Sequence, residues 1–237
     1  MEPLQITAKL GGTGNVAGAE DLPIDSILAA AWMRRHEPEA YYQSRHLITV
    51  DNLIDAELPL LKINPDTPLW YWAASFVVWP EVAANDFHYW NKRIDHREMH
   101  RVGDVKRLDI KAGRYKAYHM PIPTRAALEL RWWVVGDKAE IESLLFSITS
   151  IGKKKSQGWG AVRQWTVEPM AEDWSCYREG KPTRTIPLEE GWQTKRQDGF
   201  HIGLRTFRPP YWFAPLQTMC MLADREALIY DGTSAMA

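Results

Sequence analysis

Apolar and polar positions alternate at the start of the chain, which predicts a half-buried strand over LQITAKLGG (4–12). Its apolar side consists of Leu4, Ile6, Ala8 and Leu10. A glycine-rich turn follows, and PIDSILAAAWMRRH (23–36) is then predicted to be a helix with Asp25 as its N-cap. The buried stripe expected on this helix is Ile27, Leu28, Ala31 and Trp32.

A second set of strand and helix patterns follows. LWYWAASFVVWP (69–80) predicts a strand that a proline ends, and AALELRWWVVG (126–136) predicts another from its β-branched and aromatic residues. The period of DKAEIESLLFSITSIG (137–152) is that of an amphipathic helix, with Gly152 as its stop. GAVRQWTVEP (160–169) alternates again and predicts the last strand.

The order of these elements predicts an α+β fold, a ferredoxin-like (RRM-like) βαββαβ domain. Its sheet is antiparallel, and both helices cover one face, which leaves the other face free to bind a ligand. We expect this domain to span residues 1–169, with a polar, basic insertion at about 86–121. We expect residues 170–237 to form a C-terminal extension packed on the core.

Composition limits the class of protein. The 237 residues are 45% hydrophobic, which is enough for a core, and no apolar run approaches the roughly 18 residues of a membrane span. Cys176 and Cys220 have neither CxxC spacing nor a disulfide framework. We therefore expect a cytoplasmic protein without a signal peptide and without membrane association.

The net charge of −1 hides a local asymmetry. Residues 1–87 carry 5 Lys/Arg against 12 Asp/Glu, whereas residues 88–125 carry 10 against 4, and the remaining 112 residues carry 14 of each. A basic segment of this kind binds polyanions even in a neutral protein, so the candidate nucleic-acid contacts are local.

The most concentrated basic stretch is SIGKKKSQGWG (150–160), between the second predicted helix and the last predicted strand. Glycines permit close approach of a backbone, exposed amides and lysines hold phosphate oxygens, and the tryptophan can stack on a base. The candidate RNA-binding residues are Lys153, Lys154, Lys155, Ser156, Gln157, Gly158, Trp159 and Gly160, with Arg163 in the following strand. The alternative is an ordinary basic surface loop with Trp159 turned inward.

A glycine-rich loop at this place resembles the RAMP superfamily of CRISPR-associated proteins. The opening LQITAKLGG and LPIDSILAAA are also similar to the first strand and helix of that superfamily, and RPPYW (208–212) resembles its type IV subunit that caps the 5′ handle of the guide RNA. The resemblance implies a noncatalytic RNA-binding subunit that caps the backbone filament. Its implied partners are the guide RNA, the backbone and large subunits, and the target DNA.

The resemblance also implies that the insertion at 86–121 is a thumb lying across the guide RNA. Arginines hold phosphates bidentately, and Tyr89, Trp90 or Tyr115 would separate bases. The candidate cations of the thumb are Lys92, Arg93, Arg97, Arg101, Lys106, Arg107 and Arg114, with Lys111 and Lys116 in the same stretch. The alternative is a solvated charged hairpin.

Two patterns suggest other chemistry and are set aside. His96 and His100 have an i, i+4 spacing that suits zinc, but the neighbouring arginines repel a cation, so we expect no metal. LGGTGNVAG (10–18) does not have the GxGxxG spacing of a dinucleotide-binding turn, so we expect no cofactor.

Two rival functions remain open. YKAYH (115–119) contains the residue types of a metal-independent endoribonuclease that would process CRISPR precursor RNA, with His119 beside tyrosines and a lysine. A protein scaffold without RNA is the second rival, because the 12 tryptophans would also serve as interface anchors.

Overall fold

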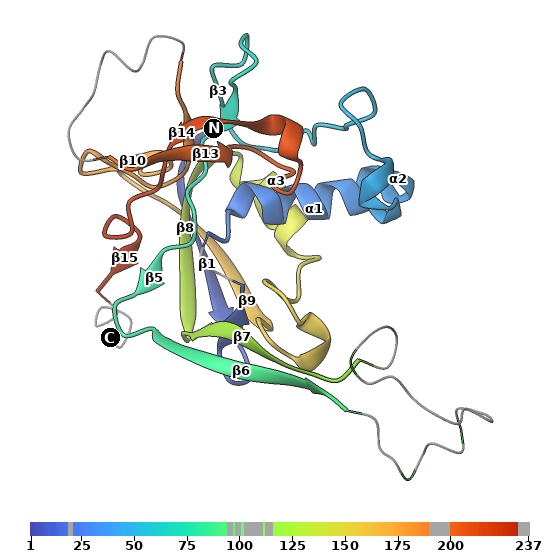
Figure 1. Cartoon of the computed structure of the whole chain (residues 1–237). Coiled ribbons are helices and arrows are strands. Elements are labelled where there is room, and N and C mark those ends of the chain that lie inside the picture. The colour runs from blue at the N-terminus through green and yellow to red at the C-terminus, as the bar shows by residue number, and fades with distance from the viewer. Residues whose placement is uncertain are drawn as a thin grey trace.

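A three-stranded antiparallel sheet lies at the centre of this computed structural model, which describes residues 1–18, 21–93, 97, 101, 111, 116–189 and 200–231. Its strands stand in the order β8 (Glu129–Gly136), β1 (Glu2–Leu10) and β9 (Val162–Pro169) (Figure 1). Ile6 of β1 is paired with Trp132 on one side and Val167 on the other. The described part of the chain is thus a mixed α+β structure with mostly antiparallel strands.

Two helices, α1 (Ile24–His36) and α3 (Lys138–Leu145), lie on one face of this sheet, and the short α2 (Pro38–Tyr42) follows α1 (Figure 1). The alternating apolar side chains of β1 and β8 face them and form the main core. Fully buried members include Leu4, Ile6, Leu28, Trp132 and Ile141. Asp137 caps α3 by accepting a hydrogen bond from the Glu140 amide at 3.0 Å.

Asp25 does not have the capping role that the sequence predicted. The N-cap position is occupied by Pro23, two residues earlier, and no side chain caps the helix. Asp25 is instead fully buried, 3.4 Å from the guanidinium of Arg184, and accepts a hydrogen bond from the hydroxyl of Tyr211 at 2.9 Å. Burial raises the pKa of the Asp25 carboxyl, while the charge of Arg184 and the hydrogen bond from Tyr211 oppose that rise.

Arg184 is buried to the same degree and joins three parts of the chain. It donates to the carbonyl oxygens of Trp72, Ala74 and Phe207, the last at 2.6 Å, in addition to its pairing with Asp25. A charge buried at this depth is tolerated only when it is paired and hydrogen-bonded. This network therefore fixes the C-terminal region to α1 and to the segment over 69–80.

The segment over 69–80 is extended but is not the continuous strand that was predicted. Only β4 (Tyr71–Trp72) and β5 (Trp79–Pro80) are strands, and isolated bridges join Ala74 and Val78 to β8. The pairing with β8 is interrupted because the amide of Phe76 donates to Thr183 of the C-terminal region at 2.9 Å.

The rest of the chain adds small sheets around this centre. β3 (Lys62–Ile63) pairs with β4, and β10 (Tyr177–Arg178) pairs with β11 (Lys181–Pro182). A three-stranded sheet has the order β12 (Ile186–Pro187), β14 (Gln217–Met221) and β13 (Ile202–Thr206). Three-residue 3-10 turns occur at Arg45–Leu47 (η1) and Ala214–Leu216 (η6).

The second face of the central sheet is not wholly free, contrary to the prediction. β15 (Ile229–Tyr230) runs parallel to β5, and Leu228 and Tyr230 pack with Trp133 of β8, which is only 3% exposed. The C-terminal region covers this side because Trp133 needs an apolar partner on the face away from the helices. The boundary at 169/170 stays a prediction.

The sequence predicted no disulfide framework and no membrane span. Cys176 and Cys220 are both free thiols. Within the described ranges, no helix is both long and apolar enough to cross a membrane.

Replacing Arg184 with Met is expected to lower the free energy of unfolding by about 3–5 kcal/mol, because it leaves the Asp25 carboxyl buried without its cation. Urea denaturation of the full chain measures this value. Arg205→Met on the exposed side of β13 is the matched control and should change it by less than about 0.5 kcal/mol. Equal effects of the two substitutions would contradict the role given to the buried pair.

Candidate nucleic-acid interface

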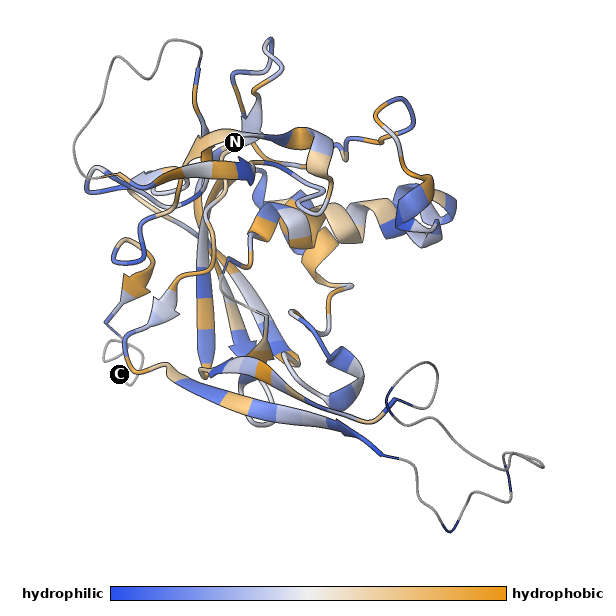
Figure 2. Ribbon diagram, viewed as in Figure 1, coloured by the Kyte–Doolittle hydropathy of each residue, from blue (hydrophilic) through white to orange (hydrophobic). Residues whose placement is uncertain are grey.

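A long hairpin lies across one end of the central sheet and extends away from it (Figure 1). It consists of β6 (Ala84–Lys92) and β7 (Tyr118–Ala126), and β2 (Asn15–Ala17) pairs with the other edge of β7. Polar residues dominate β6 (Figure 2), in line with a surface ribbon that contributes little to the core. The polar insertion predicted at 86–121 thus has a regular, paired stem.

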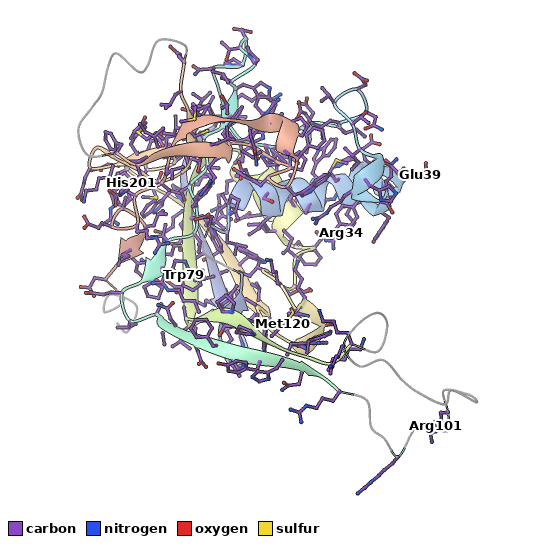
Figure 3. All side chains as sticks on the ribbon, viewed as in Figure 1. Arg34, Glu39, Trp79, Arg101, Met120 and His201 are labelled. Atoms are coloured by element: carbon purple, nitrogen blue, oxygen red, sulfur yellow. The ribbon has the colours of Figure 1, made fainter. Side chains whose placement is uncertain are left out.

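The predicted thumb cations fall into two groups. Lys92 ends β6 and Arg93 follows it, while Arg97 and Arg101 lie beyond the stem, where Figure 3 places Arg101 far from the sheet. The remaining cations predicted for RNA binding, Lys106, Arg107 and Arg114, lie outside the described residues. The same is true of His96, His100 and Tyr115.

The glycine-rich loop adopts a backbone that most residues avoid. Gly152, Gly158 and Gly160 have φ values of 75°, 80° and 63°, and Lys154 has the left-handed value of 60°. A 3-10 turn, η4 (Lys155–Gln157), lies between these positions. At Gly160 a Cβ atom would lie 2.0 Å from the carbonyl oxygen of Ile151, so only glycine is accommodated there.

Two backbone hydrogen bonds fix this loop to β2. The Lys153 amide donates to the carbonyl of Ala17 at 2.9 Å, and the Gly160 amide donates to the carbonyl of Asn15 at 2.7 Å. Because the opposite edge of β2 pairs with β7, the glycine loop and the hairpin belong to one continuous layer.

Side chains of the loop also contact the hairpin directly. The Lys154 ammonium lies 3.8 Å from the centre of the Trp90 ring, a cation–π contact. The Trp159 ring lies 4.8 Å from His88, which in turn is 3.3 Å from the side-chain amide of Asn15. Trp159 is half-buried in this contact. Its ring is therefore neither fully exposed for stacking on a base nor fully turned into the protein.

The outer part of the loop is open to solvent. Lys153, Lys155, Ser156, Gln157 and Gly158 are exposed, and so is Arg163 in β9. Although Lys155 as a whole residue is exposed, desolvation of its ammonium by neighbouring atoms lowers its pKa, and the nearby positive charge of Arg34 on α1 lowers it further. A site that concentrates cations until they repel one another is stabilised by an anion.

A small cavity of about 280 Å³ lies between the loop and the stem. Gln157 and Trp159 line it from the loop, and His88, Trp90 and Ile122 line it from the hairpin. It therefore offers an amide group and aromatic rings within one recess.

Several of these residues were missed by sequence reasoning. His88, Arg34 and Asn15–Ala17 take part only through contacts between segments far apart in the chain. The turn at 10–18 gave a weak signal, since its glycines precede and follow β2.

Tyr118 and His119, the described tyrosine and histidine of YKAYH, contact different partners. The hydroxyl of Tyr118 accepts a hydrogen bond from the Trp90 indole at 2.9 Å. His119 stacks on Tyr89 with ring centres 4.4 Å apart and bonds to the side chain of Asn91. Adjacent strand residues point to opposite faces, so the histidine and this tyrosine lie on different sides of the hairpin.

In the described part of the chain, no three or more His, Cys, Asp or Glu side chains lie close enough together to hold a metal ion.

The family comparison covers nearly all of this architecture. A family model described as "CRISPR type IV associated protein Csf3" matches residues 2–223, a range that runs from β1 to beyond β14. The chain belongs to this family. The match includes the glycine loop, the hairpin and β2, and it associates the chain with type IV CRISPR systems. No curated protein matches the chain.

Gly160→Ala is expected to lower the free energy of unfolding by more than about 2 kcal/mol, since its Cβ would clash with Ile151 and its φ is positive. Gly158→Ala is the matched control, because it has a positive φ but nothing within 4 Å of the added Cβ. It should cost only about 1 kcal/mol. Thermal or urea unfolding measures both variants. Equal losses in the free energy of unfolding would argue against the close packing of Gly160 on Ile151.

Proposed function

We propose that this protein is a noncatalytic RNA-binding subunit of a type IV CRISPR effector complex that holds the 5′ handle of the guide RNA and caps the backbone filament. The observation that carries the proposal is the packing of the lysine-rich loop on the aromatic stem of the hairpin. Membership of the Csf3 family supports an association with the CRISPR system.

The exposed side of the loop provides the phosphate contacts in this proposal. Lys153 and Lys155 supply positive charge next to a turn whose left-handed residues, Lys154 and Gly158, open the backbone toward solvent. Phosphate contacts of this kind give most of the affinity for RNA and carry little sequence information.

The recess between loop and stem provides the base contact. Gln157 can hydrogen-bond a base edge, and the rings of Trp159 and Trp90 border the same space. Single-stranded RNA is recognised largely through such unstacked bases, which suits a handle that is not paired with a target.

The sheet topology supports a ferredoxin-like RAMP core. In sequence order β1, α1, the extended segment over 69–80, β8, α3 and β9 correspond to the order βαββαβ, and β1 stands between β8 and β9. The hairpin β6–β7 is then the thumb, inserted between the second and third strands of that core. The acidic N-terminal part and the aromatic C-terminal segment would contact the backbone and large subunits, and the assembled complex would bring the chain near target DNA.

The separation of Tyr118 and His119 on opposite faces favours binding over RNA cleavage. A general base and its partners must lie within hydrogen-bonding reach of one site. A metal-independent endoribonuclease remains the alternative outcome of the test below, and so does a scaffold that binds no RNA.

Neutralising Lys153 and Lys155 together is expected to weaken binding of repeat-derived RNA and to reduce the slope of log K against log salt by about 1.4, since each phosphate contact on a single strand contributes about 0.7. Lys154 stays unchanged because it contacts Trp90. Fluorescence anisotropy of the full chain with labelled RNA in EDTA, across a salt series, gives both values.

Lys138→Ala with Arg205→Ala removes two positive charges at exposed or partly exposed sites on α3 and β13 and is the matched control. An equal loss of RNA affinity in this control would show that net charge alone explains the effect. If the wild-type chain cleaves the RNA and His119→Ala does not, the protein is an endoribonuclease and the proposal is wrong. If neither the wild-type chain nor the complex co-expressed with its guide binds RNA, the protein is a scaffold.

A further inference from the structure

A groove of about 450 Å³ lies along α1. One wall consists of residues of α1, the second is the chain over 40–56, which begins in α2, and the third is the segment over 209–212 of the C-terminal region. Figure 1 shows α1 and α2 on the side of the molecule away from the hairpin. Among the described residues, none of the glycine loop or the hairpin lines this α1–α2 groove.

Helix α1 carries apolar side chains on two sides. Leu28 and Ala31 pack in the main core against the sheet. Ala30 and Met33, which are three residues apart and therefore neighbours on the helix surface, line the groove instead. A helix that covers a sheet normally has polar side chains on the side away from the core. The second apolar side of α1 therefore indicates a contact that the core does not account for.

Large apolar side chains remain exposed along the groove. Tyr41, Ile54 and Trp212 line it and are 39%, 37% and 40% exposed. The Arg45 guanidinium lies 5.1 Å from the centre of the Trp212 ring, a cation–π contact that holds the indole in place. Tryptophan and tyrosine are among the side chains that most often dominate the binding energy of protein interfaces. The groove thus has anchors for an apolar partner.

The segment that forms the second wall is acidic. Residues 37–57 carry 5 Asp/Glu against 1 Lys/Arg. Two of these carboxylates are paired with cations of this chain. The other three, Glu37, Glu39 and Asp51, form no ion pair within the described ranges, and Glu39 lies on α2 in Figure 3. A partner that complements this wall must carry positive charge beside its apolar surface.

We propose that the α1–α2 groove binds a short amphipathic helix of another protein, with its apolar face on the exposed rings and with lysines or arginines beside Glu39 and Asp51. The inference goes beyond the proposed function and does not rest on RNA binding by the glycine loop. A phosphate backbone or an anionic lipid surface would be repelled by the unpaired carboxylates, so the charge of the groove favours a basic protein segment.

The groove suits a helix better than an extended peptide. All of its lining residues lie in helices or in irregular segments, and none lies in a strand. An extended peptide is usually held by main-chain hydrogen bonds to the edge of a sheet, which this groove does not offer. Recognition must therefore come from side chains, as when the i, i+3, i+4 and i+7 residues of an amphipathic helix enter a groove.

A second copy of this chain does not supply such a helix from its described residues. α2 carries Glu39 but no lysine or arginine, and α3 carries Lys138 against two glutamates. The cations at the end of α1, Arg34 and Arg35, are engaged with carbonyl oxygens of α3 and of the turn after it. The occupant is therefore a different protein.

The probe for this inference is a labelled synthetic helix of about 15 residues with leucines along one face and lysines on the other. Fluorescence anisotropy of the full chain without RNA measures its affinity. The same helix with glutamates in place of the lysines is expected to bind at least about tenfold more weakly, because like charges then meet. A peptide of the same composition whose leucines do not share one face is expected to lose affinity by a similar factor.

Substitutions in the groove test where the lysine helix binds. Trp212→Ala is expected to weaken binding about tenfold, because an anchor is lost. Ala30→Arg is expected to weaken it at least about tenfold, since a large cation would occupy the groove, while the helix propensity of arginine preserves α1. Glu39→Lys with Asp51→Lys is expected to weaken binding about fivefold and to make the affinity less dependent on salt.

Matched controls lie away from the groove. Ala139→Arg adds a cation at an exposed alanine of α3, Phe146→Ala removes a ring that is 92% exposed beside α3, and Glu168→Lys reverses an exposed charge on β9. These variants are expected to bind the lysine helix like the wild type. Equal losses in the controls and in the groove variants, or equal affinities for the lysine and glutamate helices, would overturn the inference.

Gel filtration of the same variants tests the alternative occupant. If the wild-type chain self-associates and Trp212→Ala or Ala30→Arg makes it monomeric, a second copy occupies the groove and the inference is wrong. An unchanged elution volume, together with the loss of the lysine helix, supports a different protein as the partner.

RNA binding by the same variants separates this inference from the proposed function. Trp212→Ala and Ala30→Arg are expected to bind repeat-derived RNA like the wild type, and the Lys153/Lys155 variant is expected to bind the lysine helix like the wild type. A wild-type chain that binds RNA but not the lysine helix overturns this inference alone. One that binds the helix but not RNA overturns only the proposed function.

Discussion

The candidate interface depends on one short strand, β2, whose two edges are both hydrogen-bonded. Ala17 and Asn15 accept from the loop amides of Lys153 and Gly160, while the other edge pairs with β7. β2 thus fixes the lysine loop and the hairpin relative to each other. The flanking positive φ values at Gly14 and Gly18 allow so short a strand to fit between two partners.

A second constraint keeps the rest of the chain in place around that layer. The buried pair of Asp25 and Arg184 joins α1 to the C-terminal region, and the carbonyls of the 69–80 segment share the same guanidinium. Tyr211, which donates a hydrogen bond to Asp25, directly precedes Trp212 in the wall of the α1–α2 groove. The packing of the core therefore also positions an aromatic ring of that groove.

Sequence patterns predicted the elements with local signals and missed those set by contacts across the chain. The alternation around Ile6 and the period around Ile141 correspond to β1 and α3. The position of Asp25 at the start of a helical pattern is typical of an N-cap residue. Its burial depends on the ion pair with Arg184, which is distant in the sequence. The lysine loop was visible as composition, but its contact with Trp90 depends on β2, whose three residues have no periodicity to detect.

The most direct test of the account is photocrosslinking of repeat-derived RNA containing 4-thiouridine to the full chain, with the crosslinked peptides identified by mass spectrometry. Crosslinks are expected in the loop, at residues 153–159, and in β6, on one or both faces of the hairpin. Crosslinks confined to the acidic segment around α2 or to β13 and β14 would contradict it, because the RNA would then avoid the layer that β2 organises.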